Sequence, residues 1–516
     1  MKIQSLIISM LAISASVMAQ ETYESAALSD LDLNGTARYV GMGGAMDALG
    51  ADLSTINSNP AGIGLFRRSY GAISGGAMIS GTSGDFNSLD RGKTTGGIDQ
   101  LGFVYAMPTS NGFLNFAFNY HKAKNFNQLY SAVGGLQNAS QNKLAWMDGG
   151  TDGFSQVDKL YGKVLSDNYY HAKGFDHISS ASGYVGSYDF NLSTNIDERF
   201  YFGFTLGIKD MHYSSSSSYI EDMVDGGYME LMDERITKGI GVDFSIGAII
   251  RPVETSPFRF GLTISTPTFY NLSTSNDTYI FNKTDFGLSY KDDKPEAKSY
   301  YDYDFCLNTP WRFGASLGTT FGRMVAVGAG YEYADYSFLS NRIDTDYGRY
   351  DDGNSEPDKE MNKHTRNSLK GVHTLKAGIE IKPAPVLAFR AGYNYVSPKY
   401  NLNAGKEIWI DSWGSECGSR SDYVNWQDTH RLTFGIGLQL TNSVTLDLAY
   451  QYSTASGEYH PFIDSAYGVD DDKIKYHLND PTLQKDSKGW FITNYADAVK
   501  VKNNRHQAMM TLGFKF

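Results

Sequence analysis

Alternation of apolar and polar residues, with a period of two, recurs along much of the chain. From Phe200 to Ile208 every second residue is apolar, and the residues between them are mostly small or polar. The same pattern runs from Leu387 to Tyr395, from Leu432 to Leu440 and from Val444 to Tyr452. Successive side chains of a β-strand point to opposite faces, whereas a helix cannot place alternate residues on one side. The chain is therefore predicted to fold mainly into half-buried β-strands.

The lengths of the connections separate a membrane barrel from a soluble β-sandwich, which also alternates. We predict fourteen strands, near residues 69–80, 98–107, 112–121, 182–194, 198–212, 236–251, 256–270, 302–320, 323–336, 371–382, 386–396, 427–440, 442–456 and 502–516. The short links are 108–111, 195–197, 252–255, 321–322, 383–385 and 441; the long links are 81–97, 122–181, 213–235, 271–301, 337–370, 397–426 and 457–501. Outer-membrane barrels have this asymmetry, with tight periplasmic turns and long outer loops. An even number of strands also closes the ring and leaves no exposed edge. The predicted fold is an all-β, 14-stranded antiparallel transmembrane β-barrel, residues 69–516, in the bacterial outer membrane.

The first 19 residues are predicted to be a secretory signal peptide. Lys2 supplies a positive charge, the stretch from Ile3 to Val17 is largely apolar, and Val17-Met18-Ala19 resembles a cleavage site. The mature chain would then begin at Gln20. No later segment offers eighteen uninterrupted apolar residues, which excludes a transmembrane helix in the mature chain.

The amino-acid composition limits the kinds of molecule that the chain can bind and the kind of fold that it can adopt. The net charge of −12 argues against nucleic acid, because phosphate binding needs a basic surface. The 54 glycines and the 14% aromatic residues suit a barrel with small lumen residues and aromatic girdles. The two cysteines, Cys306 and Cys417, are too few for a disulfide framework and have no metal-ligand spacing. Whether they pair is left open, and two unpaired thiols are favoured.

The last strand is apolar at alternate positions and ends at an aromatic residue. Its outward residues are Ala508, Met510, Leu512, Phe514 and Phe516. A terminal aromatic strand resembles the signal that the barrel-assembly machinery recognises in outer-membrane proteins. Phe514 and Phe516 are therefore predicted to form that signal.

Residues 20–68, which precede the first strand, are predicted to form a plug inside the barrel; we call them the hatch segment. They contain a run of small residues, Gly41 to Gly50, and the turn-forming sequence Asn59-Pro60-Ala61-Gly62. The run from Gly35 to Phe66 resembles the N-terminal hatch of the FadL/TodX family of outer-membrane hydrocarbon transporters, whose members carry Gly-rich residues followed by Asn-Pro-Ala-Gly. Some relatives of this family in gut bacteria are labelled hemin receptors.

This resemblance implies a fourteen-stranded barrel with an N-terminal hatch, in agreement with the count from periodicity. It places Asn59, Pro60, Ala61 and Gly62 in the hatch motif and implies passive uptake of fatty acids, aromatic hydrocarbons or similar molecules. No motif beyond the hatch segment matches the family, so the residues that contact a ligand are not assigned. A monomer is expected.

No motif points to catalysis or to a cofactor. Gly41-x-Gly43-Gly44 follows no strand and lacks the βαβ context of a nucleotide site, which favours a packing role. The ten histidines show no metal-ligand spacing. Charged residues on the lumen side of the strands are interpreted as an ion-pair lining: Lys209, Lys376, Glu380, Arg390, Arg431 and Asp447. The acidic runs Asp351-Asp352 and Asp470-Asp471-Asp472 are expected in solvated loops.

The long link 122–181 carries apolar side chains that need mutual packing or a ligand. Mutual packing is the simpler explanation for any one residue. A ligand-capturing surface at the barrel mouth is the functional alternative. Its candidate residues are Phe126, Leu129, Tyr130 and Trp146.

Three functions remain open at this point. The first is a passive channel for hydrophobic small molecules, the second a shuttle in type IX protein secretion, and the third a haem receptor that uses loop histidines such as His171 and His177. No segment resembles the TonB box and large plug of energised transporters. Besides the ligand, the expected partners are outer-membrane lipid and the barrel-assembly machinery.

Overall fold

The computed structural model describes residues 21–81, 93–147, 155–165, 171–284, 296–344, 355–407, 410–466 and 493–516. The predicted signal peptide, residues 1–19, and the two acidic runs lie outside these ranges. Within them, no helix is long and apolar enough to cross a membrane.

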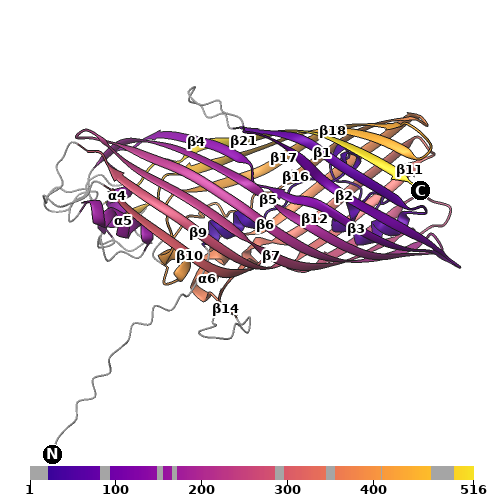
Figure 1. Ribbon diagram of the computed structural model, residues 1–516, viewed down its shortest axis with the longest axis horizontal. Helices are drawn as coiled ribbons and strands as arrows, with labels where there is room; N and C mark the ends of the chain where they lie inside the picture. Colours follow the sequence, from indigo (N-terminus) through magenta and orange to yellow (C-terminus); the bar gives the residue numbers. More distant parts are fainter. Residues whose placement is uncertain are drawn as a thin grey trace, which may run out of the picture.

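The strands close into an antiparallel barrel of 14 strands (Figure 1), as predicted. Neighbours in sequence pair around the ring, and the last strand pairs with the first, Phe514 lying opposite Gly71. The strands are β1 (Tyr70–Gly81), β2 (Lys93–Thr109), β3 (Gly112–Asn125), β4 (Gln128–Gly135), β5 (Ala172–Ile196), β6 (Phe200–Met223), β7 (Tyr228–Ile250), β8 (Arg259–Ser265), β9 (Phe269–Asn282), β10 (Glu296–Asn308), β11 (Arg312–Phe321), β12 (Val325–Asp335), β13 (Ser340–Asp344), β14 (Ser355–Pro357), β15 (Gly371–Ala384), β16 (Leu387–Val396), β17 (Tyr423–Gln439), β18 (Val444–His460) and β21 (Val499–Lys515), with a separate short pair, β19 (Ser465–Ala466) and β20 (Thr493–Asn494).

Several barrel strands are interrupted, so more than fourteen segments make up the ring. Pro267 lies between β8 and β9, and Pro310 lies between β10 and β11. Proline cannot donate to the hydrogen-bond ladder of a sheet, which explains a break at each of these points. β7 pairs with both β8 and β9, which therefore act as one barrel strand. In the same way, β3 and β4 both pair with β5.

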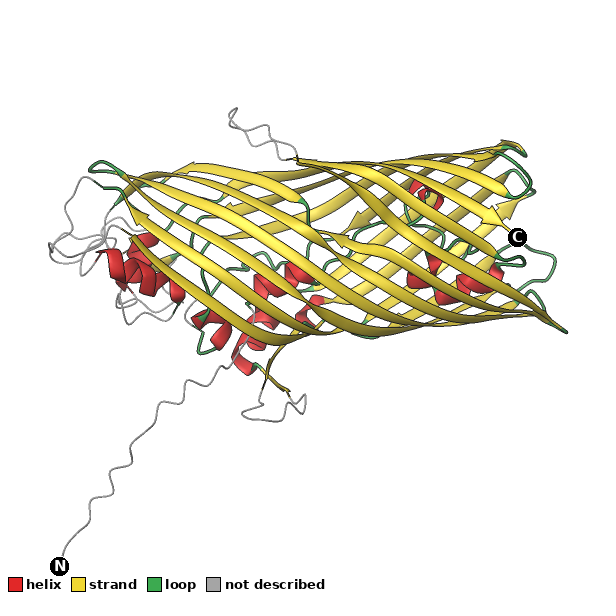
Figure 2. Cartoon of the chain, in the orientation of Figure 1, coloured by secondary structure: helices red, strands yellow, loops and turns green. Residues whose placement is uncertain are grey.

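The helices are short and lie in the hatch segment or between strands (Figure 2). They are α1 (Thr22–Leu28), α2 (Ala37–Gly41), α3 (Thr55–Ser58), the 3-10 helix η1 (Pro60–Leu65), α4 (Gln141–Met147), α5 (Gln156–Leu165), the 3-10 helix η3 (Tyr336–Phe338), α6 (Lys359–Ser368) and α7 (Trp413–Glu416). The helices α4 and α5 lie at the end of the barrel opposite Phe516 (Figure 1).

The prediction of a long loop at residues 213–235 is wrong for most of these residues. β6 continues to Met223 and β7 begins at Tyr228, so a tight turn joins two long strands. Residues 214–218 are all serine, and the apolar and polar alternation therefore ends before the strand does. The sequence pattern marks only the part of each strand that has one apolar face.

The outer face of the barrel carries a continuous apolar surface near the end with the short turns. Outward side chains of this surface are exposed although they are large and apolar: Phe202, Phe204, Phe244, Ile246, Phe434 and Ile436. In a soluble barrel such positions would be polar, whereas the lipid-facing band of a membrane barrel is apolar. This surface fits a barrel in a bacterial outer membrane.

The two ends of the barrel should differ in accessibility. An epitope tag inserted after Asp225, in the turn between β6 and β7, should be reached by antibody on intact cells. A tag inserted after Val253, in the turn between β7 and β8 at the opposite end, should be reached only after the outer membrane is permeabilised. Antibody binding to the Val253 tag on intact cells would reverse the orientation that we assign.

Candidate functional site

The hatch segment packs against the inward faces of the strands. In α2, the carbonyl of Gly41 accepts a hydrogen bond of 3.2 Å from the Thr433 hydroxyl on β17. In η1, the carbonyl of Ile63 accepts a hydrogen bond of 2.7 Å from the Asn115 side chain on β3. Thr433 and Asn115 are both fully buried. Residues 21–66 are thus surrounded by strands from different parts of the ring, while the role of this segment as a plug remains a prediction.

The Asn59-Pro60-Ala61-Gly62 motif forms the start of η1. The Asn59 side chain accepts a hydrogen bond of 3.1 Å from the Ala61 backbone N–H and donates one of 3.4 Å to the carbonyl of Ala248 on β7. Pro60 occupies the first position of the helix, where its missing N–H costs nothing. A methyl group on Gly62 would overlap a side chain of α3. This geometry ties the motif to the wall, and its functional role stays a prediction.

Four glycines of the barrel wall allow the backbone of the hatch segment to approach closely. We call them the wall glycines: Gly203, Gly328, Gly378 and Gly392. A Cβ atom at Gly378 would overlap the Met42 carbonyl, and one at Gly392 would overlap the Gly43 backbone. Because the atoms in the way are backbone atoms, no side-chain rotation relieves the overlap. The wall glycines therefore form a surface matched to this segment.

Buried ion pairs connect the hatch segment to the strands. Glu380 on β15 pairs with Arg38 of α2 at 3.1 Å and with Arg390 of β16 at 2.7 Å. Arg390 also pairs with Asp447 of β18 at 2.6 Å. A chain of four charges thus links one helix to three strands.

The remaining predicted lumen charges take part in similar pairs. Lys376 lies 3.2 Å from Asp47 of the hatch segment, and Lys209 lies 3.6 Å from Asp189 and 3.4 Å from Asp243. The ion pairs confirm the interpretation of the lumen charges as an ion-pair lining. Burying charge is favourable only where partners compensate it, and part of that compensation comes from the hatch segment.

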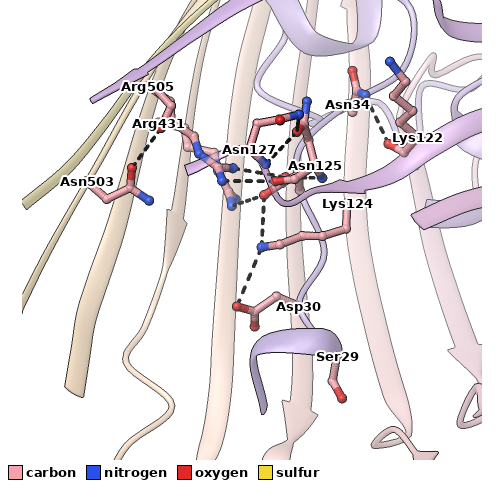
Figure 3. A network of polar contacts seen from close by, with 12 residues as sticks. Ser29, Asp30, Asn34, Lys122, Lys124, Asn125, Asn127, Arg431, Asn503 and Arg505 are labelled. Carbon is pink, nitrogen blue, oxygen red and sulfur yellow. Dashed lines mark hydrogen bonds and ion pairs between the residues drawn. The ribbon is translucent and has the colours of Figure 1, made fainter. Parts of the chain in front are cut away.

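A further ion-pair network holds the stretch that follows α1 (Figure 3). We call it the Asp30–Asp32 network; it joins the two carboxylates to Lys124 of β3, Lys399 after β16, Arg431 of β17 and Arg505 of β21. Asp32 lies 3.2 Å from Arg505 and 3.5 Å from Lys124, and it also accepts a hydrogen bond of 2.9 Å from the Asn125 N–H. Two carboxylates thus meet four cations from separate parts of the ring.

The four cations stabilise the charged form of both carboxylates. Burial by itself would raise the pKa of the Asp32 carboxyl, but the charges of Lys124, Arg505 and Arg431 outweigh burial and hold this pKa well below its usual range. Burial opposes ionisation of Asp30 too, and the charges of Lys399 and Lys124 lower its pKa. The network is therefore ionic at neutral pH.

A cavity of about 450 Å³ lies in the lumen beside this network. Aromatic rings form part of its lining: Tyr23 of α1 stacks on Tyr400 with ring centroids 5.0 Å apart, and Phe126 meets Tyr213 edge-on at 5.0 Å. Charged groups of the Asp30–Asp32 network form another part. The cavity can hold a small organic molecule of the size that protein pockets usually bind.

The wall has a break between β2 and β3. These strands pair only from Gln100 opposite His121 to Thr109 opposite Gly112. The preceding residues of β2 pair with β1, and the following residues of β3 pair with β5. The pair of β1 and β2 ends well short of the end that β5 and β6 reach (Figure 1). A cavity of about 310 Å³ occupies this break, and Asp99, Lys122, Asn125 and Gln507 contribute to its lining.

The stretch from Asp32 to Asn34 lies between the two cavities. Asn34 lines the lumen cavity, donates a hydrogen bond of 3.1 Å to the carbonyl of Lys122, and accepts one of 3.4 Å from Gln507. Lys122 and Gln507 line the cavity in the break. These hydrogen bonds hold the stretch at the boundary between the lumen cavity and the cavity in the break.

The residues predicted to capture ligand lie in different surroundings. Phe126 is buried and lines the lumen cavity, and Tyr130 also lines it. Leu129 is half-buried and is absent from the cavity lining. The side chain of Trp146 lies outside the described part of the chain. The structure thus brings two of the four residues to one cavity and places them inside the barrel.

Other predicted residues are also located. The Phe516 N–H donates a hydrogen bond of 3.1 Å to the Ser69 carbonyl at the seam of the barrel, and Phe514 is exposed on the outer face. His171 contacts the Asn138 carbonyl at 2.8 Å, and His177 is buried and stacks on Tyr459 with ring centroids 4.8 Å apart. The described residues contain no group of three or more His, Cys, Asp or Glu side chains placed to hold a metal ion. The assembly signal at Phe514 and Phe516 stays a prediction.

The sequence analysis did not identify Asp30 and Asp32. The only local signal was the alternation in Asp30-Leu31-Asp32, which is too short to stand out. Their cationic partners lie between 92 and 473 positions away along the chain. Such a network is visible only once the ring has closed.

No protein-family model matches this sequence, and no curated protein matches it. Among solved structures, a FadL homologue of Pseudomonas aeruginosa is similar, with a TM-score of 0.52 and 12% identity over 94% of this chain and 99% of that one. A deletion mutant of the TodX monoaromatic hydrocarbon channel has a TM-score of 0.50 and 11% identity, over 94% of this chain and 100% of that one. The chain therefore shares the fold of the FadL and TodX barrels.

Proposed function

We propose that the chain is an outer-membrane channel for passive uptake of hydrophobic small molecules. The observation that carries this proposal is the lumen cavity, which is lined by aromatic rings and lies next to a break in a wall surrounded by lipid. The shared fold supports it, because the FadL homologue and the hydrocarbon channel have the same barrel. Long-chain fatty acids and aromatic hydrocarbons are the substrates that we propose.

The geometry suggests a route. A ligand enters the lumen from the end that carries α4 and α5, binds between the rings of Tyr23, Phe126 and Tyr213, and leaves through the break between β2 and β3. An apolar molecule that leaves sideways stays in the membrane and avoids the cost of entering water. The stretch from Asp32 to Asn34 must move for this passage.

The described residues provide no support for the two alternative functions, a haem receptor and a shuttle in type IX secretion. His171 is engaged by a backbone carbonyl, and neither it nor His177 belongs to the lining of the lumen cavity. A shuttle for secreted chains would need a path through the lumen, which the hatch segment and its ion pairs occupy. We propose no catalytic activity, and the channel function requires no cofactor.

Filling the cavity should slow uptake. Ala455 of β18 lines the lumen cavity and is half-buried, so Ala455→Trp should place an indole in the space that the ligand needs. We expect uptake of a fluorescent long-chain fatty acid into proteoliposomes to fall roughly tenfold, the effect of about 1.4 kcal/mol. The same assay with an aromatic hydrocarbon tests the second substrate class.

The neighbouring residue provides a matched control. Ser456 is exposed on the outer face of the same strand, so Ser456→Trp adds the same side chain outside the lumen. Both variants are compared at equal amounts of folded barrel. Equal uptake by the two variants would contradict the proposal that hydrophobic molecules pass through this cavity.

A further inference from the structure

The outer face of the barrel repeats one arrangement of side chains on three successive strand pairs. The strands β12, β16 and β18 each carry tyrosine at the seventh and the ninth position: Tyr331 and Tyr333, Tyr393 and Tyr395, Tyr450 and Tyr452. The next strand in each case places a histidine directly opposite the second tyrosine: His373, His430 and His506. We call these three sets the Tyr–His pairs.

The contacts within the Tyr–His pairs are the same each time. The hydroxyl of the first tyrosine is hydrogen-bonded to the histidine Nδ1, at 2.7 Å for His373, 2.6 Å for His430 and 2.7 Å for His506. The ring of the second tyrosine lies 5.2, 5.3 and 5.0 Å from the same imidazoles. A fourth histidine, His212 of β6, lies opposite Tyr184 with ring centroids 5.3 Å apart. Such recurrence on separate strands indicates a common role.

All three pairs lie at the same level of the barrel. On β12, β16 and β18 the outward apolar face begins at the first residue of the strand and ends at the second tyrosine, so that it spans nine residues. A membrane-spanning β-strand needs about 9–11 residues. The pairs therefore mark the boundary between the apolar band and the polar region on the side away from the short turns. Their first tyrosines are 40%, 39% and 42% exposed.

The hydrogen bond to tyrosine determines what the imidazole offers to its surroundings. When the tyrosine hydroxyl donates to Nδ1, the neutral ring carries its proton on Nε2 and can donate from there. Among the described residues, Nε2 of His373 and of His506 has no hydrogen-bond partner, whereas Nε2 of His430 lies 3.1 Å from Asp428. Lys502, four residues before His506 on β21, is also exposed. His373 and His506 thus offer N–H donors at the level where lipid head groups lie.

We propose that the Tyr–His pairs bind the phosphate groups of lipids in the outer leaflet. This inference rests on the location of the barrel in the outer membrane and adds a lipid-binding surface to the proposed channel. Hydrogen bonds to a charged phosphate are shorter and stronger than those between neutral groups. Tyrosine rings alone are sufficient for an aromatic girdle at a membrane interface. The histidines add N–H donors that such a girdle does not require, which indicates that they bind a ligand.

The test removes the donors and keeps the rings. The triple variant His373→Phe, His430→Phe, His506→Phe and the native barrel are equilibrated in micelles with diphosphoryl or monophosphoryl lipid A, which differ by one phosphate. Native mass spectrometry then counts the lipids retained by folded barrels. We expect the native chain to retain the diphosphoryl lipid in preference, and the triple variant to lose roughly tenfold in retention, the effect of about 1.4 kcal/mol.

A control changes the same strands deeper in the apolar band. Leu375, Leu432 and Met510 are exposed to lipid, and their replacement by phenylalanine should leave retention at the native level. Equal retention of the two lipids by the native chain, or undiminished retention by the triple variant, would overturn the inference. If the triple variant does not fold, the single variant His506→Phe replaces it in the experiment, and we then expect a smaller loss of lipid retention.

Fatty-acid uptake distinguishes this inference from the proposed function. The three histidines face outward and are absent from the lining of the lumen cavity, so uptake should be unchanged in the triple variant. Loss of lipid retention with normal uptake supports the lipid surface. Undiminished uptake by Ala455→Trp would contradict the proposed channel, and undiminished lipid retention by the triple variant would overturn the lipid surface, so the two failures are distinguishable.

Discussion

Replacing Gly378 and Gly392 with alanine is expected to detach the hatch segment from the barrel wall while the ring of strands stays closed. Both positions are extended backbone within paired strands, so alanine is compatible with β15 and β16 themselves. The new methyl groups would overlap the backbone of Met42 and Gly43. Overpacking of this kind costs about 1–3 kcal/mol at each site, and the easiest relief is to move the hatch segment.

The expected result is a leak. With roughly 3 kcal/mol lost, the population of displaced hatch segments rises by more than about a hundredfold, and small hydrophilic dyes should cross proteoliposomes containing the double variant. Protease cleavage near Met42 should increase in parallel.

Gly314 of β11 provides the control for this experiment. It also faces the lumen, but a Cβ atom there would lie 3.4 Å from Thr263 and would not reach the hatch segment. Gly314→Ala should therefore behave as the native chain. A double variant that is as tight to dye and as resistant to protease as Gly314→Ala would show that the wall glycines do not hold this segment.

Removing the two carboxylates of the Asp30–Asp32 network should open the passage between the lumen and the break in the wall. The variant Asp30→Asn, Asp32→Asn leaves Lys124, Lys399 and Arg505 without their counter-ions and close enough to repel one another. The loss of hydrogen bonds to charged groups amounts to roughly 2–3 kcal/mol. We expect hydrogen exchange in residues 30–34 to accelerate and fatty-acid uptake to rise.

The pH dependence of this effect has a definite sign. The pKa of Asp32 is lowered in the folded protein, so the network stabilises the closed arrangement fully above the ordinary aspartate pKa of about 4 and weakens only as the pH falls through the lowered value. Relative to the intrinsic exchange rate at each pH, residues 30–34 of the native chain should therefore be as well protected at pH 5 as at pH 7, and those of the double variant should be less protected at both.

An aspartate outside the lumen serves as the control for this variant. Asp428 is half-buried on the outer face, and Asp428→Asn makes the same chemical change there. If the Asp30→Asn, Asp32→Asn variant exchanges no faster than Asp428→Asn, the network does not hold the passage closed.

The sequence by itself determined the barrel. Each of the fourteen predicted strands contains part of a barrel strand, because a strand with lipid on one side and a polar lumen on the other must alternate along its length. The run from Phe200 to Ile208 is such a case, and it lies within β6. The resemblance of residues 35–66 to a family hatch added the channel hypothesis, which periodicity could not provide.

The alternation of apolar and polar residues ends where a strand leaves the apolar band of the barrel. The upper part of β6, with Ser214 to Ser218, was assigned to a loop because polar groups surround both of its faces there, and no contrast between faces remains. The breaks at Pro267 and Pro310 were not predicted, because the alternation of apolar and polar residues continues across both prolines.

Only the tertiary structure decided the site. The carboxylates Asp30 and Asp32 are close in sequence, but their partners Lys124, Lys399, Arg431 and Arg505 come from distant strands and loops. The break between β2 and β3 likewise depends on which residues pair across two strands. A local pattern reports the surroundings of each face of one strand, whereas a charge network or an opening in the wall depends on distances between strands that are fixed only when the ring closes.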